Sequence, residues 1–437
     1  MNIIIAGAGK VGFNLAKALC VGHNVTIIDK NSEALHRIQE SLDILPMQGD
    51  VENAKTYQSF VDKKVDLFIA VTNTDNVNLI STLMAESVLE IDRRFVRLQN
   101  HFFGDTLIEE KLNIDRMIFP IKLASQGIAS LLNYPKANNV KFFKYTEHRL
   151  ISVRASKDIQ PLKITSERFT IIGVERNKEF IIPFNNQEIQ PNDLVYFFGL
   201  EDDIRTICSQ LETSEISDIQ KCVIFGGGEL AISIAKALLE IGRDVKLVEK
   251  DLELCEWANE ELGGKVSVIN SKYGTIDLFE EEGLSNADFF IAATNNDEYN
   301  IIKCLEAQEK GINKVVAINN EMEYYNLMHS LGIIVARGPK MSAYNTIMEH
   351  ISSSGVVIQK SFCGAKAVIF IRKIFSNSKL IDKKVKPIKT TNANLFYLRD
   401  ENLYHFNDKV TLIEGDSIVA FSNAKDSAKV KQWIYEL

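Results

Sequence analysis

Six residues near the start of the chain have the types and spacing of a turn that can hold a pyrophosphate. Glycines occupy the first, third and sixth places of the pattern G-x-G-x-x-G, directly after the apolar run at residues 3–6. The first glycine permits a tight turn, the second lets the backbone approach phosphates, and the third lets a following helix pack closely. The N-terminus of that helix offers N–H groups and a partial positive charge to an anion. The predicted phosphate-binding residues are Gly7, Ala8, Gly9, Lys10, Val11 and Gly12.

An acidic residue stands about 20 residues further along, where a dinucleotide site needs one. Asp29 ends the apolar run at residues 24–28. A carboxylate at this strand end can accept hydrogen bonds from ribose hydroxyls and repels a 2′-phosphate, which favours NAD(H) or an adenosine nucleotide over NADP(H). The alternative is an ordinary surface aspartate after a glycine-rich turn. The preceding strand, the following helix and the terminal acid together favour nucleotide binding at this first site.

The same order of motifs returns about 220 residues later. A second glycine-rich turn follows the apolar run at residues 223–225, and an acid ends the run at residues 245–248. Ala231 replaces the third glycine, which the pattern tolerates. A repeat of this length indicates a domain duplication rather than a solenoid. The corresponding predicted binding residues are Gly226, Gly227, Gly228, Glu229, Leu230 and Glu249.

Polar residues follow a matching apolar strand in each half of the chain. Thr72 and Asn73 follow the strand of the first half, and Thr294 and Asn295 follow that of the second. Ligands of open α/β sheets bind beyond the carboxyl ends of the strands, so these residues are predicted to lie at the binding rim. Capping of the next helix is the alternative role, because Thr, Asn and Asp are favoured N-caps. Both roles can hold together.

The two halves differ in their supporting residues. The first half carries Asp50 after its third predicted strand and Arg97 at the end of another, and both are predicted to serve the nucleotide. Arg97 could pair with a phosphate or with Asp75, and a plain surface arginine is the alternative. The second half has Asn270 and Ser271 in place of the first half's Gly-Asp pair, and no arginine matches Arg97. The second site is therefore expected to have either another ligand preference or a retained scaffold with a degraded pocket.

Apolar strands alternate with amphipathic helical patterns over about the first 120 residues, which predicts a parallel sheet flanked by helices. Short alternating runs separated by turns follow, with one closing helix, and they predict a small α+β domain. Both patterns then repeat. We expect an α/β chain of two Rossmann-like parallel-sheet domains, each followed by a small α+β domain. The expected domains span residues 1–122, 140–213, 220–338 and 356–437.

The composition narrows the classes of partner. The chain has 437 residues, of which 46% are hydrophobic and 25% charged, as in ordinary soluble proteins. A net charge of -8 argues against nucleic acid, because phosphate neutralisation needs clustered Lys and Arg. No apolar run reaches the roughly 18 residues of a membrane span, and the first residues lack the basic start of a signal peptide. The six cysteines contain no C-x-x-C pair and predict buried thiols in the reducing cytoplasm.

No catalytic constellation accompanies the nucleotide motifs. The seven histidines are scattered without metal-ligand spacing, and the sequence contains no H-E-x-x-H, G-x-S-x-G or P-loop pattern. Residues 280–282, all glutamates, predict a solvated stretch rather than a calcium site. A nicotinamide dehydrogenase needs an acid, a base or a metal where hydride is transferred. We expect a binding protein without metal or enzyme activity; an NAD-dependent dehydrogenase of the saccharopine-dehydrogenase-like type is the alternative.

The order of these motifs resembles the TrkA family, the cytoplasmic regulatory subunits of bacterial Trk potassium uptake systems, over essentially the whole chain. Members of this family contain two tandem RCK units, each with an N-terminal Rossmann-like domain and a C-terminal domain. Many enzymes share the glycine fingerprint, whereas a duplicated strand followed by T-N-x-D is more specific. The resemblance rests on residues 3–12, Asp29, 66–73, Arg97, 223–231, Glu249 and 288–298, with Leu162, 191–199 and 414–416 at the turn and final-strand motifs of RCK C-terminal domains.

The resemblance implies how such a chain would work. It implies a ring of RCK units beneath a membrane potassium channel subunit of the TrkH or TrkG type, and with two units per chain four chains make a natural ring. It implies that NAD(H), and in some members ATP or ADP, binds the Rossmann-like domains and gates the pore. The protein is then expected to be cytoplasmic and peripheral on the inner face of the cell membrane, held by its channel partner.

Overall fold

The computed structural model describes residues 1–437 except 135, 162–163, 165–168, 183–187, 214–218, 272–277 and 353–356. Leu162, one of the residues behind the family resemblance, therefore lies outside the described residues. The chain divides into two compact units. Unit 1 comprises residues 1–126 and 337–348, and unit 2 comprises residues 127–336 and 349–437.

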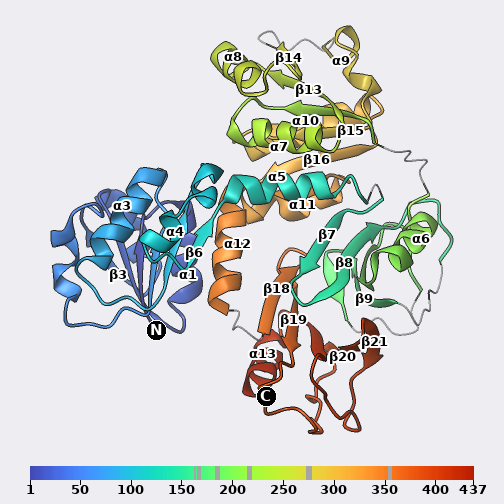
Figure 1. Cartoon of the computed structure of the whole chain (residues 1–437). Coiled ribbons are helices and arrows are strands. Elements are labelled where there is room, and N and C mark those ends of the chain that lie inside the picture. The colour runs from blue at the N-terminus through green and yellow to red at the C-terminus, as the bar shows by residue number, and fades with distance from the viewer. Residues whose placement is uncertain are drawn as a thin grey trace. The chain divides into compact units, whose positions relative to one another are not determined.

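Unit 1 contains a six-stranded parallel sheet in the order β3-β2-β1-β4-β5-β6 (Figure 1). The strand order reverses between β1 and β4, where Ala6 pairs with Ala70. This reversal opens a crevice at the carboxyl ends of the two strands. The strands are β1 (Asn2–Ala6), β2 (Asn24–Asp29), β3 (Leu45–Gln48), β4 (Leu67–Ala70), β5 (Arg94–Arg97) and β6 (Arg116–Ile118). The helices are α1 (Lys10–Leu19), α2 (Ser32–Gln39), η1 (Ala54–Phe60), α3 (Asp75–Glu86), η2 (His101–Asp105) and α4 (Ile108–Lys111).

The sequence explains why this sheet is buried on both faces. Ile3, Ile5 and Leu67 are no more than 1% exposed, because consecutive apolar residues on β1 and β4 meet helices on each side. The core of the unit joins the apolar faces of these strands to Tyr57 of η1 and Ala85 of α3. The two central strands, β1 and β4, are therefore buried between helices at the centre of the sheet.

Unit 2 contains an equivalent six-stranded sheet in the order β14-β13-β12-β15-β16-β17, parallel from β14 to β16. Its strands are β12 (Lys221–Phe225), β13 (Asp244–Glu249), β14 (Ser267–Asn270), β15 (Phe289–Ala292), β16 (Lys314–Asn319) and β17 (Ile334–Arg337). Its helices are α7 (Glu229–Glu240), α8 (Leu252–Glu261), α9 (Leu278–Glu281), η3 (Leu284–Asn286), α10 (Asp297–Glu309), η4 (Met322–Tyr324) and α11 (Tyr325–Ser330).

Unit 2 also contains two five-stranded antiparallel sheets. The first has the order β10-β9-β11-β8-β7 and the second β18-β19-β22-β20-β21 (Figure 1). The first comprises β7 (Asn139–Phe143), β8 (Thr146–Arg154), β9 (Phe169–Arg176), β10 (Glu179–Ile181) and β11 (Leu194–Gly199), with α6 (Glu201–Leu211). The second comprises β18 (Val357–Phe362), β19 (Ala367–Lys373), β20 (Ala393–Arg399), β21 (Asn402–His405) and β22 (Ser417–Asn423), with α13 (Ser427–Glu436). Two helices, α5 (Pro120–Ser130) and α12 (Pro339–Ser352), cross the unit boundaries in sequence.

The two antiparallel sheets share one hydrophobic core. Phe198 of β11 and Phe421 of β22 are fully buried, with ring centroids 5.2 Å apart. Around them lie Phe143 from the first sheet and Phe362 and Phe396 from the second. The expected α/β class, with two Rossmann-like sheets each followed by an antiparallel sheet, is thereby confirmed.

Candidate nucleotide-binding site

The three glycines of the first fingerprint have three different surroundings. Gly7 has a positive φ of +113°, and a side chain there would also press against the backbone of Thr72. A β-carbon at Gly12 would overlap the carbonyl oxygen of Gly7. At Gly9, by contrast, no atom of the described residues lies within 4 Å of such a carbon. Two glycines are thus required by the protein itself, while Gly9 leaves room for a ligand.

Asp29 stabilises the turn through both of its carboxylate oxygens. Oδ2 accepts the N–H of Ala8 at 2.6 Å, and Oδ1 accepts the N–H of Asn31 at 2.8 Å. Each oxygen retains a lone pair that a ribose hydroxyl can use. The acid at the end of β2 therefore both shapes the turn and remains available to a ligand.

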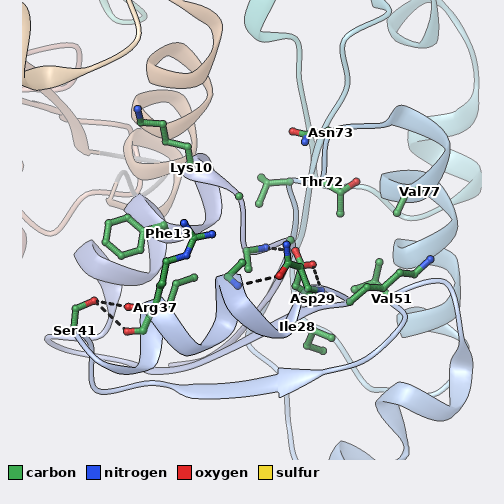
Figure 2. A pocket seen from close by; sticks show the side chains of 18 residues that line it. Lys10, Phe13, Ile28, Asp29, Arg37, Ser41, Val51, Thr72, Asn73 and Val77 are labelled. Carbon is green, nitrogen blue, oxygen red and sulfur yellow. Dashed lines mark hydrogen bonds between the residues drawn. The ribbon is translucent and has the colours of Figure 1, made fainter.

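A cavity of about 750 Å³ opens above this turn. It lies at the reversal of the strand order, where open α/β sheets bind ligands. Figure 2 shows Asp29 between Phe13 and Arg37 on one side and Thr72 and Val77 on the other. The predicted residues that line it are Gly7, Ala8, Gly9, Lys10, Asp29, Thr72 and Asn73.

Two of the predicted binding residues are used elsewhere in the structure. The described lining of the cavity includes neither Asp50 nor Arg97. Asp50 pairs with Lys30 at 3.2 Å and accepts the N–H of Glu52, and these contacts lower the pKa of its carboxyl, the Glu52 bond most. Arg97 is buried and points one guanidinium nitrogen at the carbonyl oxygen of Thr72, 3.5 Å away.

Several residues that line the cavity were not predicted from the sequence motifs. Ala34, Arg37, Ile38 and Ser41 all line the cavity. Their spacing of i, i+3, i+4 and i+7 places them on one helical face, so the signal was present in the amphipathic pattern of α2. Arg37, together with Lys10 and Lys30, supplies positive charge to the cavity, which suits a polyanionic ligand.

A buried asparagine holds the rim that follows β4. Asn78 of α3 is 1% exposed, and its Oδ1 accepts the N–H and the hydroxyl of Thr72, both at 2.7 Å. Its Nδ2 donates to the carbonyl oxygens of Thr72 and Arg97. Asn300 makes the equivalent bonds to Thr294 and to Ile318 in the second half. Because four bonds converge on each amide, the loop after the strand has a fixed shape.

A side chain caps the next helix in the second half only, and it belongs to Asn296 rather than to Thr294 or Asn295. The N-cap of α3 is Thr74, whose side chain makes no capping bond. The N-cap of α10 is Asn296, which accepts the N–H of Tyr299 at 2.6 Å. Asp75 serves another purpose, since its two oxygens accept the N–H groups of Gln99 and Asn100.

The second glycine turn repeats this geometry with a longer acid. Gly226 has a φ of +123°, and Gly228 is as open to an added side chain as Gly9, judged on the described residues. Glu249 is 8% exposed, and its carboxylate accepts the N–H groups of Gly227, Lys250 and Asp251 at 2.6 to 3.0 Å. A β-carbon at Gly227 would lie 2.7 Å from Cγ of Glu249. Gly227 and Glu249 thus take the places of Ala8 and Asp29. The longer side chain of Glu249 occupies the space that the methyl group of Ala8 takes in the first half.

The described part of the chain contains neither a membrane-spanning helix nor a metal-binding cluster. None of its helices is long and apolar enough to cross a membrane. None of its His, Cys, Asp and Glu residues gather in threes in a way that could hold a metal ion.

Comparison with known proteins places the chain in a family. The model of the TrkA-N domain matches residues 3–120 and 222–337, together more than half of the chain, and the model of the TrkA-C domain matches residues 155–212. The Trk system potassium uptake protein TrkA homolog 1 of Methanosarcina mazei is 27% identical, covering 99% of this chain and 100% of its own length. The Trk system potassium uptake protein TrkA of Halomonas elongata is 28% identical, covering 96% of this chain and 95% of its own.

Solved structures show the same fold. The GsuK RCK domain superposes with a TM-score of 0.61 at 15% identity, covering 100% of this chain and 95% of that one. The GsuK channel bound to NAD gives a TM-score of 0.62 at 13% identity, covering 100% of this chain and 79% of the other. With the TrkA-N domain matched twice, the TrkA-C domain matched between the two copies, and both kinds of sheet in place, the chain belongs to the TrkA family of RCK-domain regulatory proteins of Trk potassium uptake.

Proposed function

We propose that this chain is the nucleotide-responsive regulatory subunit of a Trk-type potassium uptake system and acts on a membrane potassium channel subunit of the TrkH or TrkG type. The observation that carries the proposal is the cavity at the strand reversal of unit 1, framed by the open Gly9 and the carboxylate of Asp29. Its full-length relatives are named as potassium uptake proteins of Trk systems. The family is regulatory, so the bound nucleotide acts as a signal and is not turned over.

The ligand proposed for the first site is NAD(H), or the adenine nucleotides ATP and ADP. The N-terminus of α1, at Gly9 and Lys10, receives the phosphates, and Val11 and Gly12 belong to its first turn. Asp29 receives the ribose, and Thr72 and Asn73 form the opposite rim. GsuK has been solved bound to NAD and bound to ADP, which supports both ligand classes for this fold. Asp50 and Arg97 are proposed to act indirectly, through Lys30 and through the Thr72 loop.

The assembly proposed is a ring of four chains, located on the cytoplasmic face of the membrane through the channel. Each chain would supply two RCK units with domains at residues 1–122, 140–213, 220–338 and 356–437. Nucleotide binding gates the pore only if its affinity differs between two conformations of the ring, because equal affinity shifts no equilibrium.

The test measures binding and potassium uptake with the same variants. Lys10→Glu places a carboxylate where α1 meets the phosphates, and we expect affinity for NAD, NADH, ATP or ADP to fall by roughly tenfold or more in calorimetry. Lys17→Glu, an exposed change near the other end of α1, is the matched control and leaves affinity unchanged. In cells that depend on this chain for growth at low potassium, the growth rate should change with Lys10→Glu and should stay the same with Lys17→Glu.

Two outcomes would contradict the proposal. One is the absence of binding of all four nucleotides to the purified wild-type chain. The other is steady production or consumption of NADH with a small substrate, which would make the chain a dehydrogenase.

A further inference from the structure

The two Rossmann-like sheets present the same backbone frame to a phosphate. Gly9 and Gly228 are both N-caps with extended backbone, at φ of -69° and -76°, and neither helix has a side-chain cap. In both halves the acid at the end of the second strand accepts the N–H of the residue after the first glycine. Any difference in ligand binding must therefore come from side chains.

The charge that meets the phosphates is reversed in the second half. Lys10 is the first residue of α1, whereas Glu229 is the first residue of α7. A carboxylate in the first turn complements the positive end of its own helix and repels an arriving anion. The counterpart of Arg37, counted from the acid that ends each second strand, is Trp257. The second site has thus lost two of the cations that line the first and gained an acid.

A larger side chain borders the corresponding space in the second half. Val77, which lines the first cavity, directly precedes Asn78, and Tyr299 directly precedes the equivalent Asn300, so the two correspond. The ring of Tyr299 packs edge-on against Phe225, the counterpart of Ala6, with centroids 6.2 Å apart. Lys250, which directly follows Glu249, places its ammonium 5.7 Å from the centroid of Tyr299. Lys250 is the counterpart of Lys30, and its contact with Tyr299 joins the residue after β13 to the start of α10.

The second sheet is also tied to the rest of unit 2 by polar contacts. Arg154 of β8 donates to the His329 ring of α11 at 3.0 Å. Lys366, beside β19, pairs with Glu175 of β9 and donates to Asn326 of α11 at 3.3 Å. One short helix, α11 between β16 and β17, is thus bound to both antiparallel sheets. These contacts give the second Rossmann-like sheet a structural role that needs no ligand.

We infer that the second Rossmann-like domain is closed to nucleotides by Glu229 and Tyr299, and that each chain binds one nucleotide, in its first half. This inference rests on the proposed function of the first site. It assigns Gly226 to Leu230, Glu249, Thr294 and Asn295 to the frame of unit 2 rather than to a ligand. In a ring of such chains, responsive and unresponsive Rossmann-like domains alternate.

The matched pair Gly9→Asp and Gly228→Asp tests the inference on the full chain. Both glycines have φ values that any residue adopts, and both are open around the added side chain within the described structure, so both variants should fold. With ADP and NAD as probes, calorimetry of the wild type should give one nucleotide per chain. Gly9→Asp should weaken binding by roughly 100-fold or more through like-charge repulsion, and Gly228→Asp should leave affinity and stoichiometry unchanged.

Two nucleotides per wild-type chain, or one remaining in Gly9→Asp at undiminished affinity, would overturn the inference while leaving nucleotide binding intact. Absence of binding in the wild type would instead refute the proposed function. Gly9→Val and Gly228→Val repeat the comparison with bulk in place of charge. If either aspartate variant fails to fold, judged by thermal unfolding, the valine pair decides between the same outcomes.

Discussion

At the scale of the residue, the glycines of the first fingerprint separate what folding needs from what a ligand needs. Gly12 lies where helix α1 meets the turn, and an added β-carbon there would overlap the Gly7 carbonyl oxygen. Gly9 meets no such restriction from the described residues. The second half accepts Ala231 at the position of Gly12, so its helix and turn have adjusted to a methyl group.

We expect Gly12→Ala to destabilise unit 1 by about 1–3 kcal/mol, because α1 must shift away from the turn to accept the methyl group. Gly9→Ala should leave stability unchanged. Differential scanning calorimetry is the appropriate measurement, since both tryptophans, Trp257 and Trp433, lie in unit 2 and do not report on unit 1. Equal melting temperatures for Gly12→Ala and Gly9→Ala would contradict this prediction, because they would show that helix α1 accepts the methyl group without a loss of stability.

At the scale of the element, a buried lysine joins strand β16 to the residues that follow helix α5. Lys314 is 3% exposed, and its ammonium donates to the carbonyl oxygens of Leu131 and Tyr134 at 3.2 and 3.3 Å. The ring of Phe289 lies 5.6 Å away. Burial lowers the pKa of this amine from 10.5 to about 7, and the negative charge of Glu212 opposes the shift.

This depressed pKa makes the stability of unit 2 depend on pH. Between pH 7 and pH 10.5 the unfolded chain binds the proton more strongly than the folded chain, so stability rises with pH over this range, by at most about 1.4 kcal/mol per unit. The gain is absent below pH 7, where both states are protonated. Urea unfolding followed by tryptophan fluorescence at pH 7, 8 and 9 measures the slope.

Lys314→Met is the control for this slope. It removes the titrating group while keeping an unbranched apolar side chain, so its stability should rise less between pH 7 and pH 9 than that of the wild type. Parallel pH dependences in the two proteins would show that the amine keeps an ordinary pKa in the folded chain.

At the scale of the whole molecule, the two antiparallel sheets depend on each other for a core. Phe421 is fully buried and its ring meets Phe198 of the other sheet, as well as Phe362 and Phe396 of its own. The same side chains therefore stabilise two segments that are more than 200 residues apart in the chain. The two antiparallel sheets of unit 2 are therefore packed as one body.

Phe421→Ala should destabilise unit 2 by about 3–5 kcal/mol, since it removes a large ring from a packed core. The tryptophan signal of the second antiparallel sheet, from Trp433 beside Phe406, should move to lower urea concentration. Phe102→Ala, at a side chain that is 64% exposed in unit 1, is the control and should not move it. A shift below 1 kcal/mol for Phe421→Ala would mean that the sheets are stable without their shared core.

The fold class was readable in the sequence because its signals are local. Consecutive apolar residues such as Ile3 to Ile5 predict a strand covered on both faces, and glycines at fixed spacing predict the turn that follows it. The acids at strand ends and the T-N-x-D segments repeated these signals in the second half. The proposed domain boundaries stay predictions, since the compact units divide the chain differently.

The contacts between residues far apart in sequence depend on how the chain folds in three dimensions. The sequence could not show that Asp50 faces Lys30 rather than the cavity, or that Asn78 and Asn300 hold the strand-end loops. Nor could it show that Tyr299 and Lys250 are in contact, or that two antiparallel sheets share one core. Periodicity and spacing determine which face of an element is apolar, whereas packing determines which residues that face contacts. The binding site depends on the packing.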